Sequence, residues 1–139
     1  PARVDAFVLS KAAWLEKAKA QAARRRAEEA APCAVTPAQA LALFETVSGR
    51  VFPLFSGVLG GVRPALKVRR MKTRWGVCVP GKRQITLNLR LAEKPMAAVE
   101  YVMVHEYAHF VHCDHSPAFW AVVARILPDY KARRALLRA

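Results

Sequence analysis

All four histidines of this 139-residue chain lie between His105 and His115. His105 and His109 are four residues apart in a segment whose apolar spacing predicts a helix, so both imidazoles project from one face and can bind one metal ion. Glu106 lies one step around the helix, where its carboxylate can reach a metal-bound water without becoming a ligand. This His-Glu-x-x-His pattern predicts a metal-dependent hydrolase site. His112 is interpreted as an exposed helix-end residue, with an accessory role at the metal or a substrate contact as alternatives.

A catalytic zinc site needs a third protein ligand and one open position. We expect His115 to be this ligand, because it follows the end of the predicted helix and directly precedes Ser116-Pro117, an N-cap and first-turn pair that opens another helix. Cys113 and Asp114 compete with it, since thiolates and carboxylates also bind zinc. Cys113 is more typical of a small buried residue and Asp114 of a helix cap, which favours His115.

The chain length suits one globular domain. Thr36, followed by Gln39, forms a capping box that opens a helix. A change to alternating apolar residues predicts strands, with a hairpin turn at Pro80-Gly81. The expected parts are an N-terminal helical segment (1–31), a helix (36–62), a small sheet (65–92) and the metal-binding helices (95–139).

Charge and cysteine content narrow the possible environments. Lys and Arg outnumber Asp and Glu by 23 to 10, a formal net charge of +13. Such a charge attracts polyanions, including nucleic acid, although the basic residues are spread along the chain as on solvated helix faces. No apolar run reaches the roughly 18 residues of a membrane span. Three cysteines without a C-x-x-C pair indicate a reducing compartment, and we expect the cytoplasm.

The segments RRMKTRWGVC, ITLNLRLAEKP and EYVMVHEYAHFVHCDHSPAFWAVVARILPDY resemble the YgjP-like zinc metallopeptidases, which are related to the SprT-like and WLM metallopeptidases. The resemblance implies an α+β, zincin-like fold in which the helices that carry HExxH and the third histidine pack on a small antiparallel sheet. It also implies Zn²⁺ bound by His105, His109 and His115, with Glu106 as the catalytic residue. The strand-rich segment usual upstream of this core is absent, so we expect a shortened chain.

Other positions of these segments are candidates for contacts with substrate. Lys72 and Arg74 flank Thr73 in a segment interpreted as a strand, so they share one face and can point at an anionic group or at a developing oxyanion. A solvated strand face is the alternative. Asn88 is interpreted as bonding backbone near the site or as ending its strand. An exposed antiparallel edge beside the zinc helix would accept an extended peptide as another strand.

The leading hypothesis is a zinc metallopeptidase in which Glu106 activates a zinc-bound water that attacks the peptide bond. The alternatives are a metal-dependent nucleoside triphosphate pyrophosphohydrolase, whose phosphates Lys72 and Arg74 would bind, and a SprT-like protease that its positive charge localises on nucleic acid. The expected partner is therefore a peptide or protein substrate, with nucleic acid as a further candidate.

Overall fold

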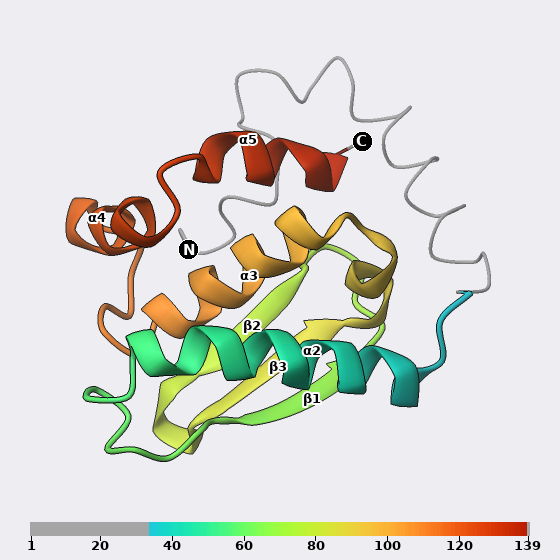
Figure 1. Ribbon diagram of the computed structural model, residues 1–139, viewed down its shortest axis with the longest axis horizontal. Coiled ribbons are helices and arrows are strands. Elements are labelled where there is room, and N and C mark those ends of the chain that lie inside the picture. The colour runs from blue at the N-terminus through green and yellow to red at the C-terminus, as the bar shows by residue number, and fades with distance from the viewer. Residues whose placement is uncertain (1–33, 139) are drawn as a thin grey trace.

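The computed structural model describes residues 34–138, in which helices pack on one three-stranded sheet (Figure 1). The helical segment expected over residues 1–31 lies outside this range. None of the described helices has the length and apolar character needed to cross a membrane. The α-helices are α2 (Pro37–Val51), α3 (Met96–Ala108), α4 (Pro117–Ile126) and α5 (Tyr130–Ala135), the strands are β1 (Ala65–Arg69), β2 (Gly76–Val79) and β3 (Gln84–Asn88), and the short 3-10 helices are η2 (Phe52–Leu54), η3 (Pro80–Lys82), η4 (Leu89–Glu93) and η5 (Leu136–Arg138).

Helix α2 begins where its capping box predicts. The Thr36 hydroxyl accepts a hydrogen bond from the Gln39 backbone N–H at 3.1 Å, and the Gln39 side chain accepts one from the Thr36 N–H at 2.9 Å. Two backbone donors of the first turn are thereby satisfied. The helix ends at Val51, shorter than the expected 36–62, because Pro53 in η2 has no N–H to donate and its ring clashes with a carbonyl four residues back.

The sheet has the order β1-β3-β2 and mixes the two pairing types. β2 and β3 form the expected antiparallel hairpin, which turns at Pro80 and Gly81 in η3 and leaves Arg83 in the left-handed conformation (φ 49°). β1, however, pairs parallel to β3, which corrects the expectation of a purely antiparallel sheet. The physical reason is that the loop over residues 70–75 reverses the chain widely enough for β3 to insert between β1 and β2.

The segment that carries Lys72 and Arg74 is part of this loop, and is not the strand that we expected. Asn88, the last residue of β3, donates from its side-chain amide to the carbonyl oxygens of Met71 at 3.0 Å and Arg74 at 2.8 Å. These two carbonyl oxygens therefore accept from a side chain, whereas in a strand they would accept from the backbone N–H groups of a neighbouring strand. Asn88 thus both bonds backbone and ends its strand, as its two interpretations expected. Lys72 and Arg74, in contrast, do not share a strand face.

Helices α2 and α3 cover the same face of the sheet, and α3 lies between α2 and α5 (Figure 1). Nearly all of α3 is buried, including every residue from Tyr101 to Ala108. A helix enclosed in this way must be apolar on most of its faces, which explains its run of Ala, Val and Met. The buried hydroxyl groups of Tyr107 and Ser48 share a hydrogen bond that joins α3 to α2.

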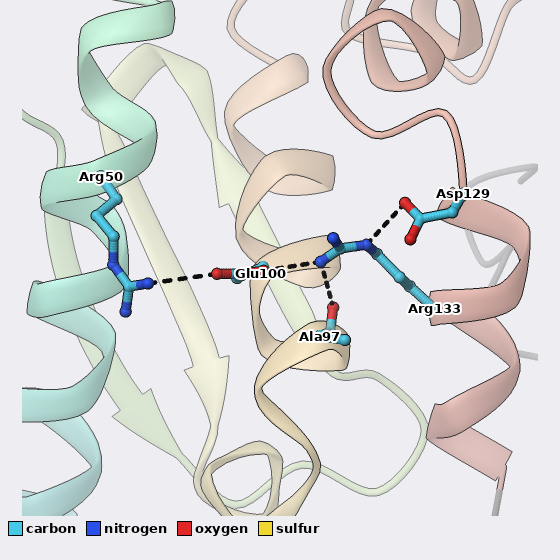
Figure 2. A network of polar contacts seen from close by, with 5 residues as sticks. All are labelled: Arg50, Ala97, Glu100, Asp129 and Arg133. Carbon is cyan, nitrogen blue, oxygen red and sulfur yellow. Dashed lines mark hydrogen bonds and ion pairs between the residues drawn. The ribbon is translucent and has the colours of Figure 1, made fainter.

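A charged network also links α3 to both neighbouring helices (Figure 2). Glu100 of α3 pairs with Arg50 of α2 at 3.4 Å and with Arg133 of α5 at 2.8 Å. Arg133 also bonds Asp129 at 2.9 Å and the Ala97 carbonyl oxygen at 3.3 Å. Because most of these side chains are partly exposed, each pair contributes about 1 kcal/mol or less. The burial of α3 therefore contributes more to its position than the network does.

Candidate metal centre

Helix α3 carries His105 and Glu106 in its last turn, and both are only 2% exposed. The helix ends at Ala108, earlier than the expected end near His112. His109 is the C-cap and keeps helical backbone angles (φ −67°, ψ −14°). The expected relation between His105 and His109, four residues apart on one helix face, is therefore preserved.

The chain returns to this helix end through a loop that stops at the start of α4. Ser116 caps α4, where its hydroxyl accepts a hydrogen bond from the Phe119 N–H at 3.3 Å, and Pro117 occupies the first helical position. This is the N-terminus that the sequence predicts. Because His115 directly precedes the capped turn, its backbone is held at the beginning of a rigid element.

The three imidazoles meet in one place. A ring nitrogen of each of His105, His109 and His115 lies within 4.8 Å of the other two. Tetrahedral zinc with Zn–N bonds of about 2.0–2.1 Å separates its nitrogens by about 3.4 Å, so small side-chain rotations would place all three on one ion. Cys113 and Asp114, the competing third ligands, are exposed and do not belong to this group.

Hydrogen bonds orient two of these imidazoles. Nδ1 of His109 lies 3.2 Å from the His112 carbonyl oxygen, which can only accept, so Nδ1 carries the proton and Nε2 keeps its lone pair for a metal. Nδ1 of His105 lies 3.2 Å from Oε2 of Glu106. Burial, reinforced by the charge of Arg134, lowers the pKa of His105 to about 3. Its imidazole is therefore neutral, which is the form that binds metals.

Glu106 has the properties of an acid–base group. Burial raises the pKa of its carboxyl to about 7, although the charges of His109 and Arg74 act in the opposite direction. Gly76, the first residue of β2, packs directly against it, since a Cβ there would lie 3.0 Å from Oε2 and 3.1 Å from Cγ of Glu106. Sequence reasoning missed Gly76, and its signal was a glycine at the start of a strand, which often marks a close approach.

Aromatic side chains of α4 and α5 lie beside the histidines. The Phe119 ring stacks on His109 with centroids 4.6 Å apart, and Trp120 stacks on His115 at 5.9 Å. Tyr130 in turn stacks on Trp120 at 5.3 Å. These contacts restrict rotation of the imidazoles. Trp120 is partly buried against a candidate ligand. Phe119 and Tyr130 were not singled out from the sequence.

The three residues predicted to contact substrate, Lys72, Arg74 and Asn88, lie in different surroundings. Arg74 is near enough to Glu106 for its charge to lower the pKa of that carboxyl, whereas Asn88 is engaged in holding the loop over residues 70–75. Lys72 lines a cavity of about 300 Å³ that we call the basic pocket. The other residues of the described range 34–138 that line it are Arg70, Met71 and Arg90.

The chain is similar to known proteins in sequence and in fold. A family model described as YgjP-like, metallopeptidase domain, matches residues 45–139, which is more than half of the chain and includes the whole candidate site. Among solved structures, the metallopeptidase zymogen of Pyrococcus abyssi abylysin is similar, with a TM-score of 0.54 and 23% identity over 65% of this chain and 87% of that chain. At this identity the likeness bears on the fold alone. A comparison with curated proteins found no match.

Proposed function

We propose, from the premise that this chain belongs to the YgjP-like metallopeptidase family, that it is a zinc-dependent peptidase with Glu106 as its general base. The family makes the chain a metallopeptidase, which acts on peptides or proteins. Three imidazole nitrogens within 4.8 Å of one another, beside a buried carboxylate, are the observation that carries the proposal. The proposed zinc ligands are His105, His109 and His115.

The donor set suits zinc. Three neutral imidazoles with one open position are a common ligand set of catalytic zinc sites. When bound, zinc supplies Lewis acidity, which lowers the pKa of a water and polarises the carbonyl group of the peptide bond. His105 is held neutral by burial, and His109 is oriented by its hydrogen bond to a carbonyl oxygen. His105 would therefore be ready to bind without first losing a proton, and His109 would present its Nε2 to the metal.

Glu106 moves the proton of the reaction. Its carboxylate takes a proton from the water whose oxygen attacks the carbonyl carbon, and then gives this proton to the amine as the C–N bond breaks. A pKa near 7 suits both steps, because the group can accept and release the proton at neutral pH. Gly76 supports this role by allowing the β2 backbone to pack against the carboxylate.

Arg74 is the cation that we assign to the developing negative charge on the substrate. Its charge acts on Glu106 within the site, and a positive charge near the reacting carbonyl stabilises the oxyanion more than the neutral substrate. Asn88 is proposed to act through Arg74, because its amide bonds the Arg74 carbonyl oxygen at 2.8 Å. Asn88 is thus a positioning residue.

Strand β2 provides a place for the substrate. Among the described strands it pairs with β3 alone, so it forms one edge of the sheet. Gly76 brings the start of this edge to Glu106. An extended peptide that pairs with the edge as another strand would place one of its peptide bonds beside the proposed zinc site.

The proposal is tested with metal-free protein that is reloaded with zinc. We expect one tightly bound zinc per chain and cleavage of unfolded casein that returns only with the metal, while His115→Ala loses tight zinc binding because a protein ligand is gone. If the variant binds zinc as tightly as the parent, His115 is not a ligand. If the reloaded parent releases pyrophosphate from nucleoside triphosphates and leaves casein intact, the nucleotide hydrolase replaces the peptidase.

A further inference from the structure

Two rings of α4 form a corner around the imidazole of His115. The Phe119 ring meets this imidazole edge-on, with centroids 5.0 Å apart and planes at 85°, and the Trp120 ring lies nearly parallel to it, at 5.9 Å and 28°. The Phe119 and Trp120 rings are themselves perpendicular, at 88°. Both edge-on and offset-stacked arrangements are favourable between aromatic rings. The two rings therefore favour one orientation of the imidazole.

The two walls of this corner are fixed in different ways. Phe119 is completely buried in the core, whereas Trp120 is only partly buried and contacts α5. There the Tyr130 ring stacks on Trp120, with centroids 5.3 Å apart and planes at 20°. The guanidinium carbon of Arg134, one turn later in α5, lies 5.7 Å from the centroid of the Trp120 ring and 5.8 Å from that of Tyr130, which is close enough for cation–π attraction. The orientation of Trp120 therefore depends on α5.

Helix α5 is in turn attached to α3. The guanidinium group of Arg133 pairs with Glu100 of α3 at 2.8 Å (Figure 2). The Tyr130 ring also stacks on Tyr101 of α3, with centroids 6.5 Å apart and planes at 14°. These contacts fix α5 on the helix that carries the first two proposed ligands, and they fix the rings that contact Trp120.

We infer that Trp120 is a positioning residue for the third zinc ligand, and that α5 influences zinc affinity through it without supplying a ligand. This inference rests on the proposed function, because it takes His115 as a zinc ligand. A ligand that is already oriented loses less freedom when the metal binds, so contacts that orient it raise the affinity for the metal. The stacked Trp120 ring acts in this way by restricting the tilt of the His115 imidazole.

A purely structural role for these rings makes a different prediction. If Trp120 only fills the core, its substitution lowers the free energy of unfolding but leaves the folded protein with its zinc affinity and its metal geometry unchanged. Zinc affinity is measured by competition with a chelator, in conditions where circular dichroism shows every variant to be folded. The visible absorption spectrum of the cobalt-loaded protein reports the geometry of the ligands. These two measurements separate positioning from packing.

Substitutions of Trp120 test the inference. We expect Trp120→Leu to bind zinc about 10- to 100-fold more weakly than the parent, which is the usual cost of losing a group that orients a metal ligand, and to change the cobalt spectrum. Trp120→Phe keeps a ring beside His115 and should restore most of the affinity. Because Phe preserves the aromatic packing, this variant also provides a measurement if the Leu variant does not fold.

Substitutions of Tyr130 test the part played by α5. Tyr130→Leu should weaken zinc binding less than Trp120→Leu does, and Tyr130→Phe, which keeps the ring, should bind zinc as the parent does. If Tyr130 acts only through Trp120, the variant with both Leu substitutions binds zinc no more weakly than Trp120→Leu alone. Effects that multiply in the double variant would overturn the role of α5. Arg134 is kept, because its charge also acts on His105.

Val123→Ala is the matched control, because it removes volume from a fully buried position of the same helix. It should lower stability in urea and keep the zinc affinity and cobalt spectrum of the parent. The inference is wrong if Trp120→Leu also keeps both, or if Val123→Ala loses as much zinc affinity as Trp120→Leu; either result leaves the peptidase standing. A parent that binds zinc but does not cleave casein overturns the peptidase alone, and a parent that binds no zinc overturns both.

Discussion

At the scale of single residues, burial gives the candidate site its chemistry. His105 and Glu106 are neighbours in sequence and are almost completely enclosed, and burial disfavours the charged form of each. The pKa of the imidazole falls to about 3, while the pKa of the carboxyl rises to about 7. One environment therefore yields a neutral metal donor and a carboxyl group that exchanges its proton near neutral pH.

The raised pKa of Glu106 predicts how the stability of the metal-free protein depends on pH. Its folded-state pKa of about 7 exceeds the ordinary value of 4.5, so the stabilisation it confers is present below pH about 4.5 and is lost as the pH rises through 7. The free energy of unfolding of metal-free Glu106→Gln, minus that of the parent, should therefore rise by on the order of 3 kcal/mol between pH about 4.5 and pH about 7. Urea titrations at several pH values measure it.

A half-exposed carboxylate provides the control for this experiment. Glu45→Gln removes a carboxylate whose side chain is 50% exposed, and its unfolding is measured over the same pH range. The lowered pKa of His105 makes each of these proteins less stable as the pH falls. Because His105 is present in all of them, this effect largely cancels when their free energies of unfolding are subtracted. A constant difference between Glu106→Gln and the parent across the range would show that the Glu106 carboxyl does not have a raised pKa.

Much of the candidate site could be predicted at this scale, for a physical reason. Helical spacing relates His105 to His109, and the Ser116-Pro117 pair locates the next helix start, so local rules suffice for the proposed ligands. Gly76 and Phe119 approach the site through tertiary packing. No local rule connects residues that are about 30 positions apart in the chain, and for this reason the packing of Gly76 on Glu106 was not predicted.

At the scale of elements, the close packing of β2 against α3 predicts a sharp effect of one methyl group. In Gly76→Ala the new Cβ would lie 3.0 Å from Oε2 of Glu106 and 3.2 Å from Cγ1 of Val102. Since neither buried neighbour can move away freely, we expect a loss of about 1–3 kcal/mol in stability and a lower kcat as the carboxylate shifts. Urea unfolding and casein cleavage measure the two effects.

Gly81→Ala is the matched control, because a Cβ at Gly81 would meet nothing within 4 Å. It should change both quantities little. Equal effects of the two substitutions would mean that the close approach of Gly76 to Glu106 has no special role.

Elements with local start signals agree with the sequence predictions, and elements set by distant contacts do not. The capping box at Thr36 opens α2 as expected, because all of its hydrogen bonds lie within four residues. The loop that follows β1 is held by Asn88, which is 14 and 17 residues from the carbonyl groups that it bonds. Alternation of residues cannot reveal such bonds, so this loop was read as a strand and the parallel pairing of β1 was missed.

At the scale of the whole molecule, a net charge of +13 predicts weak, sequence-independent binding of nucleic acid. Binding of labelled DNA, followed by fluorescence anisotropy, should weaken steeply with salt because neutralised phosphates release counterions. Lys72→Gln should change it little, since one charge of many is removed. Binding that is strong and independent of salt would contradict this expectation.

Our central claim is that Glu106 transfers protons beside a zinc ion that three histidines hold. The most direct test is to measure how fast zinc-loaded Glu106→Gln cleaves unfolded casein. Gln matches the size of Glu but cannot accept the proton of water. We predict one zinc per chain, a folded protein, and a cleavage rate about 10²–10⁴ below that of the parent. Cleavage by the variant at the parent's rate, with the same zinc content, would contradict the claim.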